Sequence, residues 1–451
     1  MNRFSHRLFF LCVSFLLFVA ASCSQKESNP WVDRALSMAK AMFHDDTTGY
    51  SPYVRPGFQE NYTRQKVRTQ IAMIEERFGT LDSLILPVYK KITSSHVVDI
   101  LCCLQKGMFT WRFVFDDSVR LVGTTLLRPT IPYDPPSYVD TSAFTELPVL
   151  LGANANLLPG KFTVPRGKPP YPVVIFIHDA GPRDENETRG LNVFFKDLAW
   201  GLASRGIAGM RYQKRTYAYP GQLSPDSVSL ENEIIDDVYG TIDFIKTRMN
   251  LDSTRIFLVG HGTGGYLVPR LLAEKPLLAG GIIMGSPAKS VTDGLRERVK
   301  HLLSLPDSLR GYSRVSEALI PRLDSLRAGL LPDSSRVFGM PARYFYELKE
   351  SSPEVFLRSS FVAPLFIVQG GRDFEYGMKQ LGEWKSLFSD TRAVAFKFYP
   401  DLNHLFENVL IFPAPSPRDY YIRTHVDSLV VFDIADWITK RVRMQVPRTG
   451  K

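Results

Sequence analysis

The chain has 451 residues, more than one average domain, so two domains or one large elaborated domain are expected. Hydrophobic residues make up 44% of the chain and charged residues 22%, a composition that is typical of a globular protein with a large core and excludes a disordered chain. The formal net charge is +9, yet the basic residues are spread along the chain and form no run of five. We therefore interpret the charge as a solvated surface and expect no nucleic-acid partner.

The first 22 residues are predicted to be a lipoprotein signal peptide. Residues 1–7 are basic, and residues 8–21 are apolar but too few for an ordinary membrane span. The letters AASC at residues 20–23 resemble the end of a bacterial lipoprotein signal. That resemblance implies cleavage before Cys23, lipidation of this cysteine, and an exported protein anchored in the bacterial cell envelope. An ordinary secretory signal with an incidental cysteine is the alternative.

The remaining cysteines predict neither a disulfide nor a metal site. Cys102 and Cys103 are neighbours in an apolar run, and neighbouring residues rarely form an unstrained disulfide. We expect them to be buried thiols. No spacing of cysteine and histidine is typical of metal ligands, so neither a metal nor a cofactor is expected.

Residues 30–128 are predicted to form a small α+β domain. Helical periodicity covers residues 31–43 and 63–79, and residues 96–129 are rich in β-forming residues with a hairpin turn at FDDSV. The pattern F-x-x-D-x-x-V-R-L-V-G at residues 113–123 resembles a small domain of unknown function that often precedes α/β-hydrolase domains in exported bacterial proteins. No residue in this domain indicates chemistry.

Residues 129–144 are proline-rich and predict a linker, and residues 145–441 predict an α/β domain. After an antiparallel strand pair at 145–167, apolar strands alternate with helices, which indicates a mostly parallel sheet with helices on both faces. Charged helical segments at 288–358 interrupt the alternation and predict a cap over the site, with a solvated insertion as the alternative. The predicted strands are 173–179, 207–215, 255–260, 279–286, 364–373 and 393–404, and the predicted helices are 191–206, 230–250, a helix from 264 onward, and 426–441.

Four stretches fall at the carboxyl ends of predicted strands, where sheets of this kind bind ligands. HDAGPRDENET follows the first of these strands, GHGTG occupies residues 260–264, and Asp373 in GGRD and His404 in LNH follow the last two. The order of elbow, acid and histidine resembles the α/β-hydrolase family, near its serine-aminopeptidase-like and acyl-transferase-like esterases. The resemblance implies the α/β-hydrolase fold, with Asp373 as the catalytic acid and His404 as the general base.

The nucleophile of that family is missing. The elbow G-x-S-x-G carries glycine at its centre here, and Gly262 has no oxygen with which to attack a carbonyl. The resemblance also implies oxyanion-binding amides near Ala180 and at Thr263. Asp179 is a second departure, because the family usually has glycine there and a carboxylate opposes the developing charge. Thr263 and Ser286 are the alternative nucleophiles, although a threonine after the elbow points elsewhere and a turn-capping role explains the serine.

Three functional hypotheses follow. The first is an esterase-family lipoprotein with weak or no hydrolytic activity that holds an acyl or peptide-like ligand, since losing a triad nucleophile lowers turnover by about 10⁶. The second is a hydrolase that uses another nucleophile, and the third is a non-catalytic binding module. We also expect Asp373 and His404 to be hydrogen-bonded with the Cα atom of Gly262 facing the imidazole, so that a serine at 262 fits at modest cost.

Overall fold

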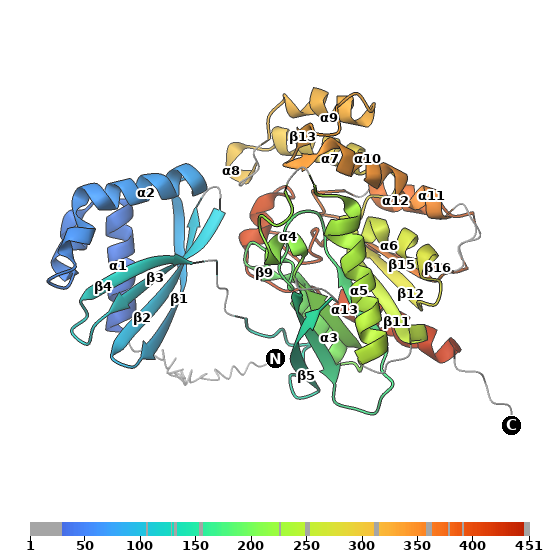
Figure 1. The fold of residues 1–451 in the computed structure, drawn as a ribbon, viewed down its shortest axis with the longest axis horizontal. Helices are drawn as coiled ribbons and strands as arrows, with labels where there is room; N and C mark the ends of the chain where they lie inside the picture. The colour runs from blue at the N-terminus through green and yellow to red at the C-terminus, as the bar shows by residue number, and fades with distance from the viewer. Residues whose placement is uncertain are drawn as a thin grey trace, which may run out of the picture. The chain divides into compact units, whose positions relative to one another are not determined.

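The computed structural model divides the chain into two compact units (Figure 1). The small unit comprises Met1–Leu104 and Phe109–Thr130, and the large unit comprises Gln105–Met108 and Ile131–Lys451. The structure describes residues 29–104, 107–127, 129, 133–152, 157–224, 227–248, 253–310, 315–357, 363–377, 379–389 and 392–445. The predicted leader, with Cys23, lies outside these residues. Within them, no helix is both long and apolar enough to span a membrane.

The small unit builds one core from helices and a four-stranded sheet. The strands lie in the order β1-β2-β3-β4, and the β1–β2 and β3–β4 pairs are antiparallel. Both long helices begin at a capping side chain, because Asn29 accepts from the amides of Trp31 and Val32, and Thr63 accepts from the amide of Lys66. The elements are α1 (Pro30–Phe43), η1 (Thr47–Gly49), η2 (Ser51–Tyr53), η3 (Gln59–Tyr62), α2 (Arg64–Phe78), β1 (Leu81–Ile92), β2 (Ser95–Leu104), β3 (Gly107–Phe115) and β4 (Leu121–Leu127).

Strand β1 is the strand of the small unit that the sequence analysis did not predict. Its pairing with β2 shifts register between Ile85 and Val88, and Leu86 has a φ of +50° at this irregularity. The shift breaks the period-2 alternation by which a strand is recognised. The predicted helices, the strands β2 to β4 and the buried free thiols of Cys102 and Cys103 are confirmed.

An eight-stranded sheet forms the centre of the large unit, in the order β16-β15-β12-β11-β7-β10-β6-β5. The neighbouring pairs from β16 to β10 are parallel, and the pairs β10–β6 and β6–β5 are antiparallel. The mostly parallel sheet with an antiparallel pair at its start is therefore as predicted. The strands are β5 (Phe144–Leu151), β6 (Leu158–Pro165), β7 (Val173–Ile177), β10 (Ala208–Tyr212), β11 (Ile256–His261), β12 (Gly280–Met284), β15 (Leu365–Gly370) and β16 (Val394–Tyr399).

Helices bury both faces of this sheet. One core contains α3 and α13, and the other contains α5, α6 and α12, which explains why the central strands β7 and β11 are apolar and wholly buried. The sheet-covering helices are α3 (Phe194–Ala203), α5 (Asp236–Arg248), α6 (Thr263–Glu274), α12 (Lys379–Ser386) and α13 (Ser428–Gln445). The short elements are β8 (Thr188–Arg189), β9 (Asn192–Val193), α4 (Arg215–Ala218), η4 (Glu231–Ile235), η5 (Ser253–Arg255) and η6 (Pro417–Tyr421).

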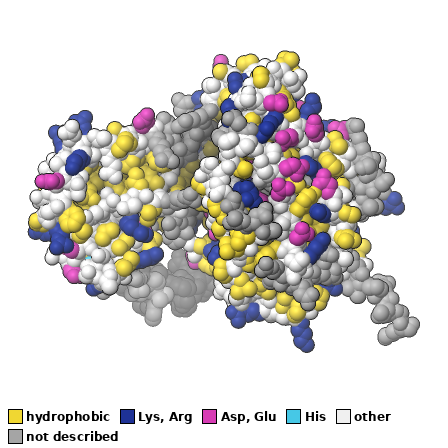
Figure 2. All heavy atoms as spheres, in the orientation of Figure 1, with side chains coloured by type: hydrophobic (Ala, Val, Ile, Leu, Met, Phe, Trp, Pro, Cys, Tyr) yellow, Lys and Arg dark blue, Asp and Glu magenta, His cyan; other side chains and the backbone are white. Residues whose placement is uncertain are grey.

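The segment between β12 and β15, predicted as a cap, is mainly helical, and its helices lie together at one end of the large unit (Figure 1). Apolar residues of α7 and α10 join the core that contains α5 and α6. On the face shown in Figure 2, Lys and Arg side chains are interspersed with Asp and Glu. The elements of this segment are α7 (Val291–Ser304), α8 (Asp307–Arg310), α9 (Leu319–Arg327), β13 (Arg336–Val337), β14 (Met340–Pro341), α10 (Ala342–Glu350) and α11 (Pro353–Leu357).

Candidate functional site

The turn between β11 and α6 has the geometry of an elbow. Gly262 follows the strand directly, with φ of 52° and ψ of −118°, and α6 begins at the next residue. A Cβ atom at Gly264 would lie 2.2 Å from the carbonyl oxygen of Ile177, and one at Gly260 would lie 2.4 Å from the carbonyl oxygen of Gly264. Glycine is therefore needed at these positions, because the helix starts pressed against the strands.

Asp373 and His404 come together at the carboxyl ends of neighbouring strands. Asp373 follows β15 and His404 follows β16, and Nδ1 of the imidazole lies 3.0 Å from Oδ2 of the carboxylate. Both side chains are wholly buried. The other carboxylate oxygen of Asp373 accepts from the amides of Glu375 at 2.8 Å and Tyr376 at 3.0 Å, which holds the carboxylate in place. The expected hydrogen bond between acid and histidine is confirmed.

The carboxylate of Asp179 occupies the space beside Gly262. A Cβ atom built on Gly262 would lie 2.3 Å from Oδ1 of Asp179 and 2.4 Å from its Cγ. The same oxygen accepts a hydrogen bond of 2.8 Å from the amide of Thr263, which the sequence assigned to oxyanion binding. The expectation that a serine at 262 fits at modest cost is wrong, because the direction in which its side chain would extend is filled by Asp179.

A second acid and two arginines surround Asp179. Arg189 binds Oδ2 of Asp179 and lies 3.3 Å from Oε1 of Glu375. Glu375 also accepts from Nη1 of Arg298 at 2.8 Å and from the hydroxyl of Tyr420 at 2.6 Å. Burial raises the pKa of both carboxyls, but the surrounding cations, with Arg189 the strongest, together outweigh burial and hold the pKa of Asp179 and of Glu375 well below its usual range. Both acids are therefore ionised and paired at neutral pH.

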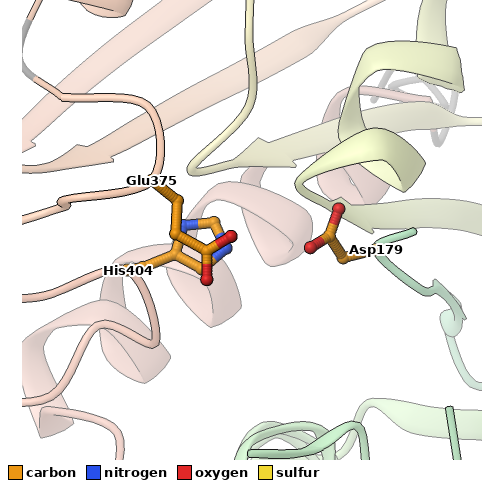
Figure 3. A group of neighbouring side chains, drawn as sticks. All are labelled: Asp179, Glu375 and His404. Carbon is orange, nitrogen blue, oxygen red and sulfur yellow. The ribbon is translucent and has the colours of Figure 1, made fainter. Parts of the chain in front are cut away.

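His404 faces this charged group. Burial lowers the pKa of His404, but the carboxylates of Asp373 and Glu375 outweigh it and raise that pKa to about 9. Its Nε2 atom is buried and has no hydrogen-bond partner among the described residues. In Figure 3 the imidazole lies beside the Glu375 carboxylate, and the Asp179 carboxylate points toward both from the opposite side. The neighbouring carboxylates therefore favour the protonated imidazole at neutral pH.

Within the described part of the chain, one group of three side chains is spaced closely enough to bind a metal ion together. Atoms of Asp179, Glu375 and His404 all lie within 4.8 Å of one another. Carboxylate and imidazole are ordinary ligands for zinc and similar cations. However, Arg189 already bridges the two carboxylates, and a divalent ion would have to share them with this guanidinium. The guanidinium thus supplies the positive charge that a metal would bring.

The loops that carry these groups are tied together beneath the surface. Glu187 accepts from the amide of Asp179 at 3.1 Å and contacts Nδ1 of His261 at 3.0 Å. Nε2 of His261 lies 3.0 Å from the carbonyl oxygen of His404. The Glu187 carboxylate and the His261 imidazole thus connect the Asp179 loop to the His404 loop, and the positions of Asp179 and His404 are coupled through His261.

The two alternative nucleophiles, Thr263 and Ser286, differ in their access to the cavity described below. Thr263 lines this cavity, as does Ala180, whereas Ser286 is not among the lining residues. The hydroxyl of Ser286 donates to the carbonyl oxygen of Pro287 at 3.3 Å, and its Cβ atom lies behind the elbow, 2.9 Å from where a Cβ of Gly265 would be. Ser286 therefore packs under the start of α6.

A cavity of about 460 Å³ opens between this charged group and the cap. Sequence analysis did not identify five of its charged lining residues, because single arginines and glutamates usually lie on the surface and give little sequence signal of a buried site. These residues are Arg183, Arg189, Glu233, Arg298 and Glu375. The apolar lining comes largely from the cap and consists of Val291, Leu295, Phe338, Met340, Phe345 and Leu348, with Leu223 and Val228 from the segment before α5.

Comparison with known proteins places this site in a family. The model of the serine aminopeptidase (S33) family matches residues 192–408. Esterase EstD of Thermotoga maritima is 33% identical over 355 residues, which make up 78% of this chain and 82% of that esterase. This chain belongs to the α/β-hydrolase esterase family. Its mostly parallel sheet with helices on both faces is the α/β-hydrolase fold, as predicted.

Solved structures of other α/β-hydrolases are also similar to this one. Est1E from Butyrivibrio proteoclasticus matches with a TM-score of 0.44 and 16% identity, covering 66% of this chain and 99% of that one. The acylaminoacyl peptidase of Pyrococcus horikoshii matches with a TM-score of 0.47 and 14% identity, covering 82% of this chain and 57% of the peptidase.

Proposed function

We propose that this α/β-hydrolase binds a ligand in the cavity beside its elbow and does not hydrolyse esters by a serine mechanism. The observation that carries the proposal is the position of the Asp179 carboxylate, which fills the side-chain space of residue 262 and takes the Thr263 amide. In this reading Gly262 stands where the nucleophile of an active esterase would be. An internal carboxylate then replaces both the attacking oxygen and the bound oxyanion.

The electrostatics of the site support the same proposal. A general base must be unprotonated, and the pKa of about 9 at His404 keeps its imidazole protonated at neutral pH. A negative Asp179 beside the Thr263 amide opposes the charge that develops in ester hydrolysis. Losing one oxyanion donor lowers turnover by about 10²–10³, and losing the nucleophile lowers it by about 10⁶.

The cavity supports a role in binding. Its volume of about 460 Å³ is in the usual range for small-molecule sites, and its lining combines apolar residues, most of them from the cap, with a small number of charged groups. The relatives named an esterase and a serine aminopeptidase favour an acyl or peptide-like ligand. We further propose that lipid on Cys23 holds this binding protein at the membrane of the cell envelope, as the sequence predicts.

Two assays on the purified mature protein test the proposal. Fluorophosphonate labelling reports an activated serine, and release of nitrophenol from short-chain nitrophenyl esters reports turnover. We expect no labelling and no hydrolysis above that of the His404→Ala variant. Stoichiometric labelling, or turnover that disappears in His404→Ala, would overturn the proposal. Peptide mapping of the label would then show whether Ser286 is the nucleophile.

A further inference from the structure

One guanidinium in the cavity is left without a partner. Arg183 lines the cavity from the loop after β7, and its Nε atom is buried without a hydrogen bond. Among the described residues, no carboxylate lies within ion-pair distance of Arg183. We infer that Arg183 binds the carboxylate of an amphiphilic ligand whose apolar part lies against the cap. This inference rests on the proposed binding function and names its ligand class.

The other arginines of the cavity, and the Thr263 amide, already bind protein carboxylates. Arg189 is shared by Asp179 and Glu375, and Arg298 binds Glu375. The amide of Thr263 is occupied by Asp179. A ligand carboxylate placed at any of these groups would have to displace a protein carboxylate that is buried and fixed. Arg183 is the cation of the cavity that can accept an anion without such a displacement.

The charges of the lining agree with this assignment. Asp179 and Glu375 balance Arg189 and Arg298. A third acid of the lining, Glu233, is balanced by the buried Lys214, whose Nζ lies 2.9 Å from it. The Arg183 charge is then the excess positive charge of the lining. Burial and repulsion by the Arg189 guanidinium lower the pKa of Arg183, and the more distant carboxylates of Asp179 and Glu375 offset this only in part. A bound monoanion would restore that balance.

The shape of the lining indicates what the carboxylate is attached to. The cap contributes Leu295 from α7 and Phe345 and Leu348 from α10 to the same lining as Arg183. Burying an alkyl chain or an apolar side chain against such a wall is favourable by roughly 25 cal/mol per Å². The ligand is therefore a carboxylate on an apolar body, either a fatty acid or the free C-terminus of an apolar peptide.

Calorimetric titration of the purified mature protein tests the inference, with decanoate and decanol below their aggregation limits. A second pair, an apolar tripeptide with a free or an amidated C-terminus, distinguishes the two sources of the carboxylate. We expect each acid to bind at least tenfold more tightly than its neutral partner, since a charged hydrogen bond changes affinity by about ten- to hundredfold. The tighter of the two acids identifies the source.

Variants localise the effect. Arg183→Gln should weaken binding of the acid at least tenfold and leave decanol binding unchanged, and Arg183→Lys should restore part of the difference. Arg322→Gln, an exposed arginine of α9 outside the cavity lining, is the matched control and should bind like the parent. Equal affinities for acid and neutral ligands, no binding of either acid, or an unaffected Arg183→Gln would each overturn the inference. The binding experiments and the hydrolysis assays are read out independently. Failure of the inference can therefore be distinguished from failure of the proposed lack of ester hydrolysis.

Discussion

Restoring an esterase at this site should require two substitutions, not one. In Gly262→Ser alone, the new Cβ would lie 2.3 Å from Oδ1 of Asp179, far inside van der Waals contact. Asp179 cannot move away without breaking its bonds to Arg189 and to the Thr263 amide. We therefore expect the single variant to be destabilised and inactive. Asp179→Gly removes the obstructing carboxylate, and the double variant should gain activity.

The structure sets the size of these effects. A serine at φ of +52° costs about 1–3 kcal/mol in backbone strain. Removing Asp179 leaves Arg189 with Glu375 as its remaining partner, which costs about 3 kcal/mol, the lower end for a broken buried ion pair. The steric clash disappears in the double variant. The double variant should therefore lose less free energy of unfolding than the sum of the losses in the two single variants, and the difference should be about 1–3 kcal/mol.

The assay measures hydrolysis of nitrophenyl butyrate by four proteins: the parent, the two single variants and the double variant. The double variant should exceed the parent by at least ~10² in kcat/KM, and His404→Ala should abolish the gain. Removing Asp179 also removes one of the carboxylates that raise the pKa of His404, which favours the neutral base. Asp179→Asn with Gly262→Ser is the control that keeps the obstruction and should stay inactive. Equal activity of Gly262→Ser alone and the double variant would refute the steric argument, and a folded but inactive double variant would refute the inherited site.

Three further predictions concern stability and location. Lys214→Met should lower the free energy of unfolding by about 3–5 kcal/mol, because Glu233 stays buried without its cation; a loss below about 1 kcal/mol in urea titration would contradict this. Burial raises the pKa of Asp419 to about 6 from an ordinary 3.8, so its charged form costs stability as pH rises from about 4 to 6. Relative to the parent, Asp419→Asn should therefore gain about 1–2 kcal/mol between pH 4 and pH 7 in chemical denaturation, and a pH-independent difference would show that the carboxyl is not perturbed. Cys23→Ala should release the protein from the membrane fraction, whereas unchanged membrane association with an unmodified N-terminus would refute the lipoprotein prediction.

Much of the fold was predictable because its signals are local. The apolar strands β7 and β11 are buried on both sides, so they read as continuous hydrophobic runs between helical segments. Glycines at 260, 262 and 264 marked the elbow because a tight strand-to-helix turn needs them. The pairing of Asp373 with His404 followed from the order of strands, since parallel strands bring their carboxyl ends to one edge. Strand β1 escaped prediction because its register shift interrupts the alternation.

The sequence by itself determined the family, the sheet and the absence of a side-chain oxygen at residue 262. The tertiary structure decided which group fills the space beside this glycine, namely the carboxylate of Asp179. Asp179 and Gly262 are far apart in the chain, and Arg189 meets Glu375 across 186 residues, so no local pattern reports either contact. Whether a buried carboxylate is an obstruction, an ion-pair partner or a ligand depends on which charges the fold brings within a few ångströms, because Coulomb interactions in a desolvated site are set by distance and not by order along the chain.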